Sequence, residues 1–480
     1  MGTTLTKLEA PQASRTALHN AAVQIGGRLA MTVMRFLAAG VVIRHAGVET
    51  YGEFALVLAM MIFAEAVIDF AMTDVAVRTI AQESGAERPL MRSLVRAKIL
   101  LAVVASAVFA GAVLAIGYPR HFQLAVLVAL GNSLATAVVL INRVSFRARL
   151  RMGREVLAEL VSVACFVPAV WLCARAGQSL AVLVACFVGA RMIFAGLTVL
   201  LSTRDREAGD PDTLDRRYNA GWLFRESAVL AASMLLMRCY EIGDPLVISQ
   251  LLDERALGLY LGAQRFIGLL TMLIYPIAHT WFPLLSAYLM TDRPRFERSV
   301  SAVFRLVSFV SLWAGLTMAL LAEWLLGLLG ADMTAAAPAF RLLLAAGVVQ
   351  CLMTYLGILI IAMRGHRAVI YITVFAVISK LGWLYVLVPL HGIVGAAGAT
   401  LGSELGVLLV SVFTLRQMKC RCSWRIWAHL VPALAVTLGL AAWIGGWRNP
   451  WLGGAVAAVF PLLLFATRGL TLADLRPQKS

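Results

Sequence analysis

The chain has 480 residues, of which 61% are hydrophobic and only 14% are charged, and its formal charge is +16. Repeated long apolar runs with so few charges exclude a soluble multi-domain protein. They predict an all-α protein that crosses a membrane many times. The runs are continuous rather than alternating, which is not the pattern of a β-barrel. The cysteines are odd in number and lie mostly inside apolar runs, so they indicate core side chains and no disulfide framework.

The apolar runs predict about fourteen transmembrane helices. They cover residues 17–43, 53–80, 95–117, 122–144, 156–174, 179–201, 223–250, 257–285, 299–329, 339–363, 368–388, 394–415, 426–447 and 451–467. A charged segment containing Pro and Gly, residues 202–222, follows the sixth span. We interpret it as a cytoplasmic linker between an N-terminal lobe (1–201) and a C-terminal lobe (223–415), each made of six spans. Residues 416–480 then hold an appended pair of spans and a cytoplasmic tail.

A faint internal repeat supports two pseudo-symmetric lobes. Tyr51-Gly52-Glu53-Phe54 opens the second span, and Leu257-Gly258-Leu259-Tyr260 opens the eighth. Repeated lobes of this kind are common in secondary transporters.

The basic residues of the loops predict the orientation. One alternate set of loops carries most of them, among them Arg88, Arg92, Arg96, Lys98, Arg147, Arg149, Arg151, Arg154, Arg293, Arg295, Arg298, Arg416, Lys419, Arg421 and Arg425. The other set carries only Arg44, Arg120, Arg175, Arg255 and Arg448. The positive-inside rule therefore predicts that both termini are cytoplasmic. The same distribution accounts for the net charge by topology, so no nucleic-acid partner is expected.

The first two spans carry polar and charged side chains on one helix face each. At about 100° per residue, the face of the first span holds Asn20, Gln24, Arg28 and Arg35. The face of the second span holds Glu65, Asp69 and Thr73. An ionisable side chain at membrane depth costs at least ~2.5 kcal/mol, so such residues are expected to face a partner or a watery cavity.

Several short motifs, in this order along the chain, resemble those of one transporter family. They are Glu49-Thr50-Tyr51-Gly52-Glu53-Phe54, Ile68-Asp69-Phe70-Ala71, Leu257-Gly258-Leu259-Tyr260, Phe282-Pro283-Leu284-Leu285-Ser286 and Pro389-Leu390-His391-Gly392. Together they resemble the polysaccharide-biosynthesis flippases, which move O-antigen and exopolysaccharide units. This family belongs to the multidrug/oligosaccharidyl-lipid/polysaccharide exporter superfamily.

The resemblance implies a transporter of two six-helix lobes that works by alternating access. The implied substrate is an undecaprenyl-diphosphate-linked oligosaccharide, moved from the cytoplasmic to the periplasmic leaflet of the bacterial inner membrane. A polysaccharide polymerase and a chain-length regulator are the implied protein partners. Two alternatives within the superfamily stay open, a lipid II flippase and a drug/cation antiporter. Fourteen spans resemble the lipid II branch and many sugar-unit flippases, whereas the antiporters usually have twelve.

In the implied architecture, spans one, two, seven and eight line the cavity. Because arginine stays charged and its donor fork matches phosphate oxygens, we expect arginines of these spans to hold the headgroup. The substrate-binding candidates are Arg28, Arg35, Arg238 and Arg265, with Asn20 and Gln24 beside them.

Four carboxylates in the same spans, Glu65, Asp69, Glu241 and Asp244, are candidates for charge balance or for coupling to Na⁺ or H⁺. Lys380 is a secondary candidate. Alternatively, the four arginines and four carboxylates form structural salt bridges with one another. No nucleophile–base pair, metal cluster or cofactor motif stands out, so no enzyme activity is expected.

Overall fold

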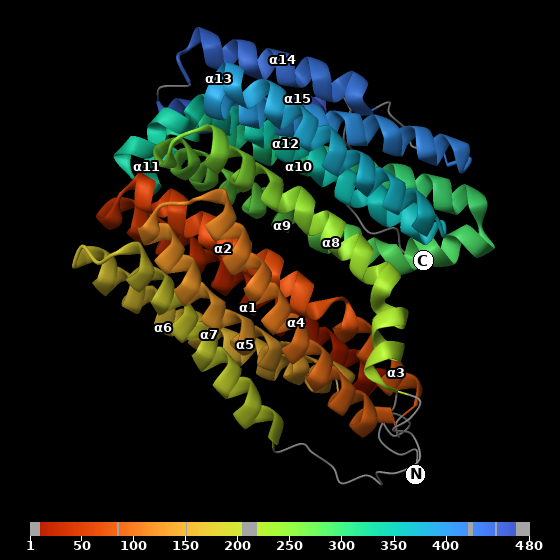
Figure 1. The fold of residues 1–480 in the computed structure, drawn as a ribbon. Coiled ribbons are helices and arrows are strands. Elements are labelled where there is room, and N and C mark those ends of the chain that lie inside the picture. The colour runs from red at the N-terminus through yellow and green to blue at the C-terminus, as the bar shows by residue number, and fades with distance from the viewer. Residues whose placement is uncertain are drawn as a thin grey trace. The chain divides into compact units, whose positions relative to one another are not determined.

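The computed structural model describes residues 10–83, 86–149, 151–203, 218–420, 426–446 and 449–466. Every regular element within these ranges is helical, which confirms the all-α prediction. The chain divides into two compact units, Met1–Ile242 and Gly243–Ser480, drawn from red to yellow-green and from green to blue in Figure 1. The division lies inside one helix, and most of the predicted linker (202–222) falls on residues outside the described ranges.

The first unit contains α1 (Ala10–Ala46), α2 (Val48–Asp69), α3 (Met72–Gln82), α4 (Glu87–Ile116), α5 (Arg120–Ala148), α6 (Met152–Arg175), α7 (Leu180–Thr203) and most of α8 (Ala220–Leu251). Here α5 is the central helix, because it packs against α2, α3, α4 and α7. This arrangement places side chains of α5 directly beside the polar face of α2.

The second unit contains the end of α8, α9 (Glu254–Thr291), α10 (Arg293–Leu320), α11 (Ala322–Leu329), the 3₁₀ helix η2 (Ala331–Ala336), α12 (Ala337–Ala362), α13 (His366–Gln417), α14 (Trp427–Trp443) and α15 (Pro450–Ala466). Its core joins α9, α10 and α12 to the last two helices. The appended pair packs onto α10, where Trp313 donates from Nε1 to the carbonyl oxygen of Ala457 at 3.1 Å.

Eleven helical segments in the described ranges are long and apolar enough to cross a membrane, and α14 and α15 are shorter apolar helices. One of the eleven, within α13, is a hairpin that crosses twice, as shown below. The eleven segments, the second crossing of the α13 hairpin and the two shorter helices together agree with the prediction of about fourteen spans. The chain is therefore a multi-pass membrane protein.

The hairpin in α13 turns at Gly392, whose φ of 57° and ψ of −135° are not helical. The two arms run antiparallel, because Ser403 of the second arm donates to the carbonyl oxygen of Ala376 in the first at 3.3 Å. Near the turn the arms touch so closely that a Cβ on Gly395 would lie 2.0 Å from the carbonyl oxygen of Leu387. Glycine is thus required at both positions, for its backbone freedom at residue 392 and for its size at residue 395.

The span predicted as one helix over 53–80 is two helices, α2 and α3. The break falls at Phe70 (φ 44°) and Ala71 (φ 54°), which both lie in the left-handed region. Neither residue is glycine, so each costs on the order of 1–2 kcal/mol of strain. Other contacts must hold this conformation in place.

We predict that Gly395→Ala lowers the free energy of unfolding by about 1–3 kcal/mol, because the new methyl group overlaps the Leu387 backbone. The measurement is thermal unfolding of the purified protein, followed by tryptophan fluorescence. Gly382→Ala, in the same helix, is the matched control, since no atom lies within 4 Å of its added Cβ. Equal stability of the two variants would contradict the close approach at the turn.

Candidate functional site

The polar face predicted for the second span exists, and cations from other helices of the first unit bind it. Thr73 donates a hydrogen bond to Asp69. Lys98 of α4 lies with its Nζ 2.6 Å from Asp69 Oδ1 and 3.1 Å from Thr73 Oγ1. Its side chain is 0% exposed. The prediction that Lys98 is a loop residue is wrong, because it lies inside α4 and its side chain is buried against this face.

Lys98 lies at the break between α2 and α3. Asp69 is the last residue of α2 and Thr73 lies in the first turn of α3, so one ammonium group binds both helix ends. Its Nζ is also 3.5 Å from the carbonyl oxygen of Asp69. These contacts offset the strain at Phe70 and Ala71.

Glu65 lies one helical turn before Asp69 and pairs with two arginines. Arg191 of α7 approaches it at 3.0 Å and Arg143 of α5 at 3.8 Å. Arg191 also donates to Asn132 and Thr136 of α5, at 3.2 and 3.3 Å. The sequence analysis gave no role to Arg143, which lies inside an apolar span without a neighbouring acid in the chain.

The Arg143 guanidinium extends this network to α6, where its Nε donates to Glu155 Oε1 at 2.5 Å. The result is a row of alternating charges, Arg191–Glu65–Arg143–Glu155, that connects α7, α2, α5 and α6. A buried charge is tolerated in a low-dielectric region only when it is paired in this way.

The arginines of α1 are in a different situation. The Arg35 guanidinium binds Glu159 of α6 at 2.5 Å, yet its side chain is 51% exposed. Arg28 is exposed and forms no ion pair with any residue in the described ranges. The side chains of Asn20 and Gln24 lie outside the described part of the chain.

The remaining candidate residues belong to both units, with Arg238 and Glu241 in the first and the others in the second. Arg238 pairs with Glu241 one turn along α8, and both side chains are largely exposed. Arg265 is partly buried on α9, in the second unit. Asp244 is fully buried and pairs with Lys380 of α13 at 2.7 Å.

The expectation that the four carboxylates pair with the four named arginines holds for Glu241 and Arg238. Glu65, Asp69 and Asp244 instead pair with Arg191 and Arg143, with Lys98 and with Lys380. In these four ion pairs each partner comes from a different helix than the carboxylate.

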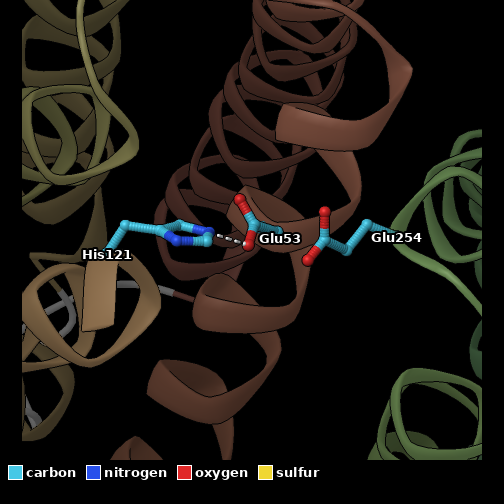
Figure 2. Close-up of side chains that lie close together, drawn as sticks. All are labelled: Glu53, His121 and Glu254. Carbon is cyan, nitrogen blue, oxygen red and sulfur yellow. Dashed lines mark hydrogen bonds and ion pairs between the residues drawn. The ribbon is translucent and has the colours of Figure 1, made fainter. Parts of the chain in front are cut away.

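A further side-chain contact joins the starts of α2 and α5. Figure 2 shows the ring of His121 beside the carboxylate of Glu53, with Nε2 and Oε1 2.6 Å apart. Glu53 is buried whereas the His121 side chain is half exposed. The contact gives a partner to a carboxylate that the sequence analysis treated only as part of a motif.

Comparison with known proteins identifies the family. Residues 17–289 match the model of a family described as polysaccharide biosynthesis protein. The chain belongs to this family. Comparison with curated protein sequences finds no significant match.

Solved structures show where else this fold occurs. A lipid II flippase MurJ in an inward closed conformation superposes with a TM-score of 0.77 at 12% identity, covering 95% of this chain and 99% of that chain. An inward-facing multidrug resistance transporter of the MATE family gives 0.67 at 13% identity, covering 81% and 95%. A transporter of the same superfamily from Pyrococcus furiosus gives 0.58 at 14% identity, covering 84% and 94%. At these identities the likeness establishes the fold, which is that of the superfamily predicted from the motifs.

We predict that Lys98→Met lowers the free energy of unfolding by about 3–5 kcal/mol, because it removes the buried cation from the Asp69 carboxylate, whose side chain is only 19% exposed. The double variant Lys98→Met/Asp69→Asn removes both charges and should recover most of that loss. Unfolding of the purified protein in detergent measures both effects.

The matched control is Arg78→Ala, which breaks an ion pair with Glu226 whose two side chains are exposed. It should cost less than about 1 kcal/mol. If Arg78→Ala and Lys98→Met cost the same, the buried pair does not hold the α2–α3 break.

Proposed function

We propose that the protein is a flippase for undecaprenyl-diphosphate-linked oligosaccharides. In this proposal it moves them by alternating access from the cytoplasmic to the periplasmic leaflet of the bacterial inner membrane, for synthesis of a cell-surface polysaccharide. Family membership and a fold found in a lipid flippase support it. The observation that carries it is the pair of exposed arginines in the first span, one of them without an ion pair among the described residues.

A diphosphate needs its charge balanced at every depth of the membrane, since bare charge in hydrocarbon is costly. Arg28 and Arg35 lie seven residues apart, so they share a helix face with a separation of about 10 Å along the axis. Two permanently charged donor forks at that spacing suit a headgroup that carries phosphates and sugars. Arg35 binds the Glu159 carboxylate, which the substrate phosphate would displace from the guanidinium.

Other charged residues have roles in the proposal as well. Arg238 and Arg265 provide further headgroup contacts. Glu65, Asp69 and Asp244 balance other cations of the chain, so the positive charge of the α1 arginines remains available to the headgroup. Both chain termini are cytoplasmic, as the basic loops predict. A polysaccharide polymerase and a chain-length regulator would act on the product.

A lipid II flippase is the second candidate. The lipid II flippase superposes over 99% of its own length, and that match extends over more of this chain than the MATE transporter does. Both candidate substrates present a diphosphate to the same arginines. The drug/cation antiporter has less support, because a cationic drug would be repelled by an exposed, unneutralised arginine.

We expect cells that lack the protein to accumulate complete lipid-linked oligosaccharides in the cytoplasmic leaflet. Arg28→Ala and Arg35→Ala should each lower the export rate about 10- to 100-fold, since a charge-assisted hydrogen bond to phosphate contributes about 1.5–3 kcal/mol. The readout is the pool of lipid-linked units, assigned to a leaflet by accessibility to an added enzyme or label, at matched membrane levels of each variant.

Arg298→Ala, which removes an exposed arginine at the start of α10, is the control and should export normally. Accumulation of lipid II in place of oligosaccharide units would favour the second candidate. If both α1 variants restore export fully, the proposed flippase function stands, but Arg28 and Arg35 do not bind the headgroup. Normal pools with raised drug sensitivity would favour the antiporter.

A further inference from the structure

Asp244 is completely buried, and it is bound by a cation of the chain itself. Lys380 of α13 donates from Nζ to Asp244 Oδ2 at 2.7 Å, and only 4% of the Lys380 side chain is exposed. Gln264 of α9 donates to the same oxygen at 3.2 Å. The second carboxylate oxygen, Oδ1, is buried and has no hydrogen-bond partner among the described residues.

One further oxygen-bearing side chain lies beside this carboxylate, and another lies next to that one. Tyr260 of α9 lies beside Asp244, and its hydroxyl is 3.1 Å from Thr400 Oγ1 in the second arm of α13. Carboxylate and side-chain amide oxygens are among the ligands that hard cations prefer. The unpartnered Oδ1 adds a free acceptor to this group.

The site nevertheless already holds one positive charge. With Lys380 in place the carboxylate is neutralised, and a metal ion entering the pocket would leave an excess charge in a fully buried region. The ammonium also occupies one face of the carboxylate at hydrogen-bond distance. Without Lys380, the same oxygens would surround an uncompensated anion.

We propose that Lys380 is a built-in counter-cation that takes the place of a bound monovalent metal ion at Asp244. The native protein then has no Na⁺ requirement at this site, and removing the ammonium group creates a Na⁺ site. Lys380 is a residue that determines ion specificity. The transport part of this inference rests on the proposed function, whereas the binding part does not.

The first experiment measures thermal unfolding of the full-length protein in detergent, in NaCl and in KCl of equal concentration. The wild-type protein should unfold at the same temperature in both salts. Lys380→Ala should unfold at a lower temperature in KCl and gain on the order of 2–5 °C in NaCl, because Na⁺ binds the folded state alone. Lys380→Gln, whose amide still donates to Asp244, carries the same test if the alanine variant does not fold.

Asp244→Asn/Lys380→Ala is the matched control, because it lacks both charges. It should not respond to Na⁺. A wild-type protein that Na⁺ stabilises, and that loses this response in Asp244→Asn, would overturn the proposal. So would folded Lys380 variants that unfold at the same temperature in both salts.

The second experiment replaces Na⁺ by K⁺ while the export of lipid-linked units is measured. Export by the wild-type protein should stay unchanged, and a Na⁺ requirement that Asp244→Asn removes would overturn the inference. If the stability experiment gives the expected pattern but no lipid-linked unit is exported, the proposed function fails while the counter-cation stands.

Discussion

The constraint on which this structure depends is the cost of an uncompensated charge among membrane-spanning helices. Each unit buries a lysine against an aspartate, Lys98 on Asp69 in the first and Lys380 on Asp244 in the second. Neither pair would be needed in a protein held together by apolar contacts alone, because a hydrophobic pair of similar volume is often as stable. Removing one partner of either pair would instead leave an uncompensated charge, which is strongly destabilising.

In the first unit the same constraint shapes the backbone. A helix that ended at Asp69 and restarted at Met72 through two left-handed residues would be strained if nothing bound its ends. Lys98 supplies donors to both ends, and α5, packed beside α2, supplies Arg143 to the turn above. The polar residues on both sides of the break therefore bind the cation that stabilises it. Loss of a cation here would affect the conformation of the helix as well as the local charge.

The sequence was sufficient for the number of spans and for the faces that carry charge, because apolar length and the 3.6-residue period are local properties. It was not sufficient for the partners. Lys98 follows a cluster of loop arginines, so only the packing of α4 shows that its side chain points inward. The break at Phe70 and Ala71 lacks the glycine or proline that marks most interruptions. The pairing of Lys380 with Asp244 could have been predicted, because the sequence already shows each of them as a charged residue inside an apolar span.

The distribution of unmatched charge follows from these pairings. Within the first unit, Glu65 and Asp69 are already bound by cations from α4, α5 and α7, so they have little charge left to offer the arginines of α1. Arg35 binds Glu159 but keeps a 51% exposed side chain, and Arg28 is exposed and has no ion pair within the described ranges. An internal network that neutralises the acids thereby leaves positive charge on one helix. An anionic headgroup is the ligand that would neutralise such a site. The acids Glu65, Asp69 and Asp244, which are candidates for ion coupling, are instead paired with basic side chains of the same chain.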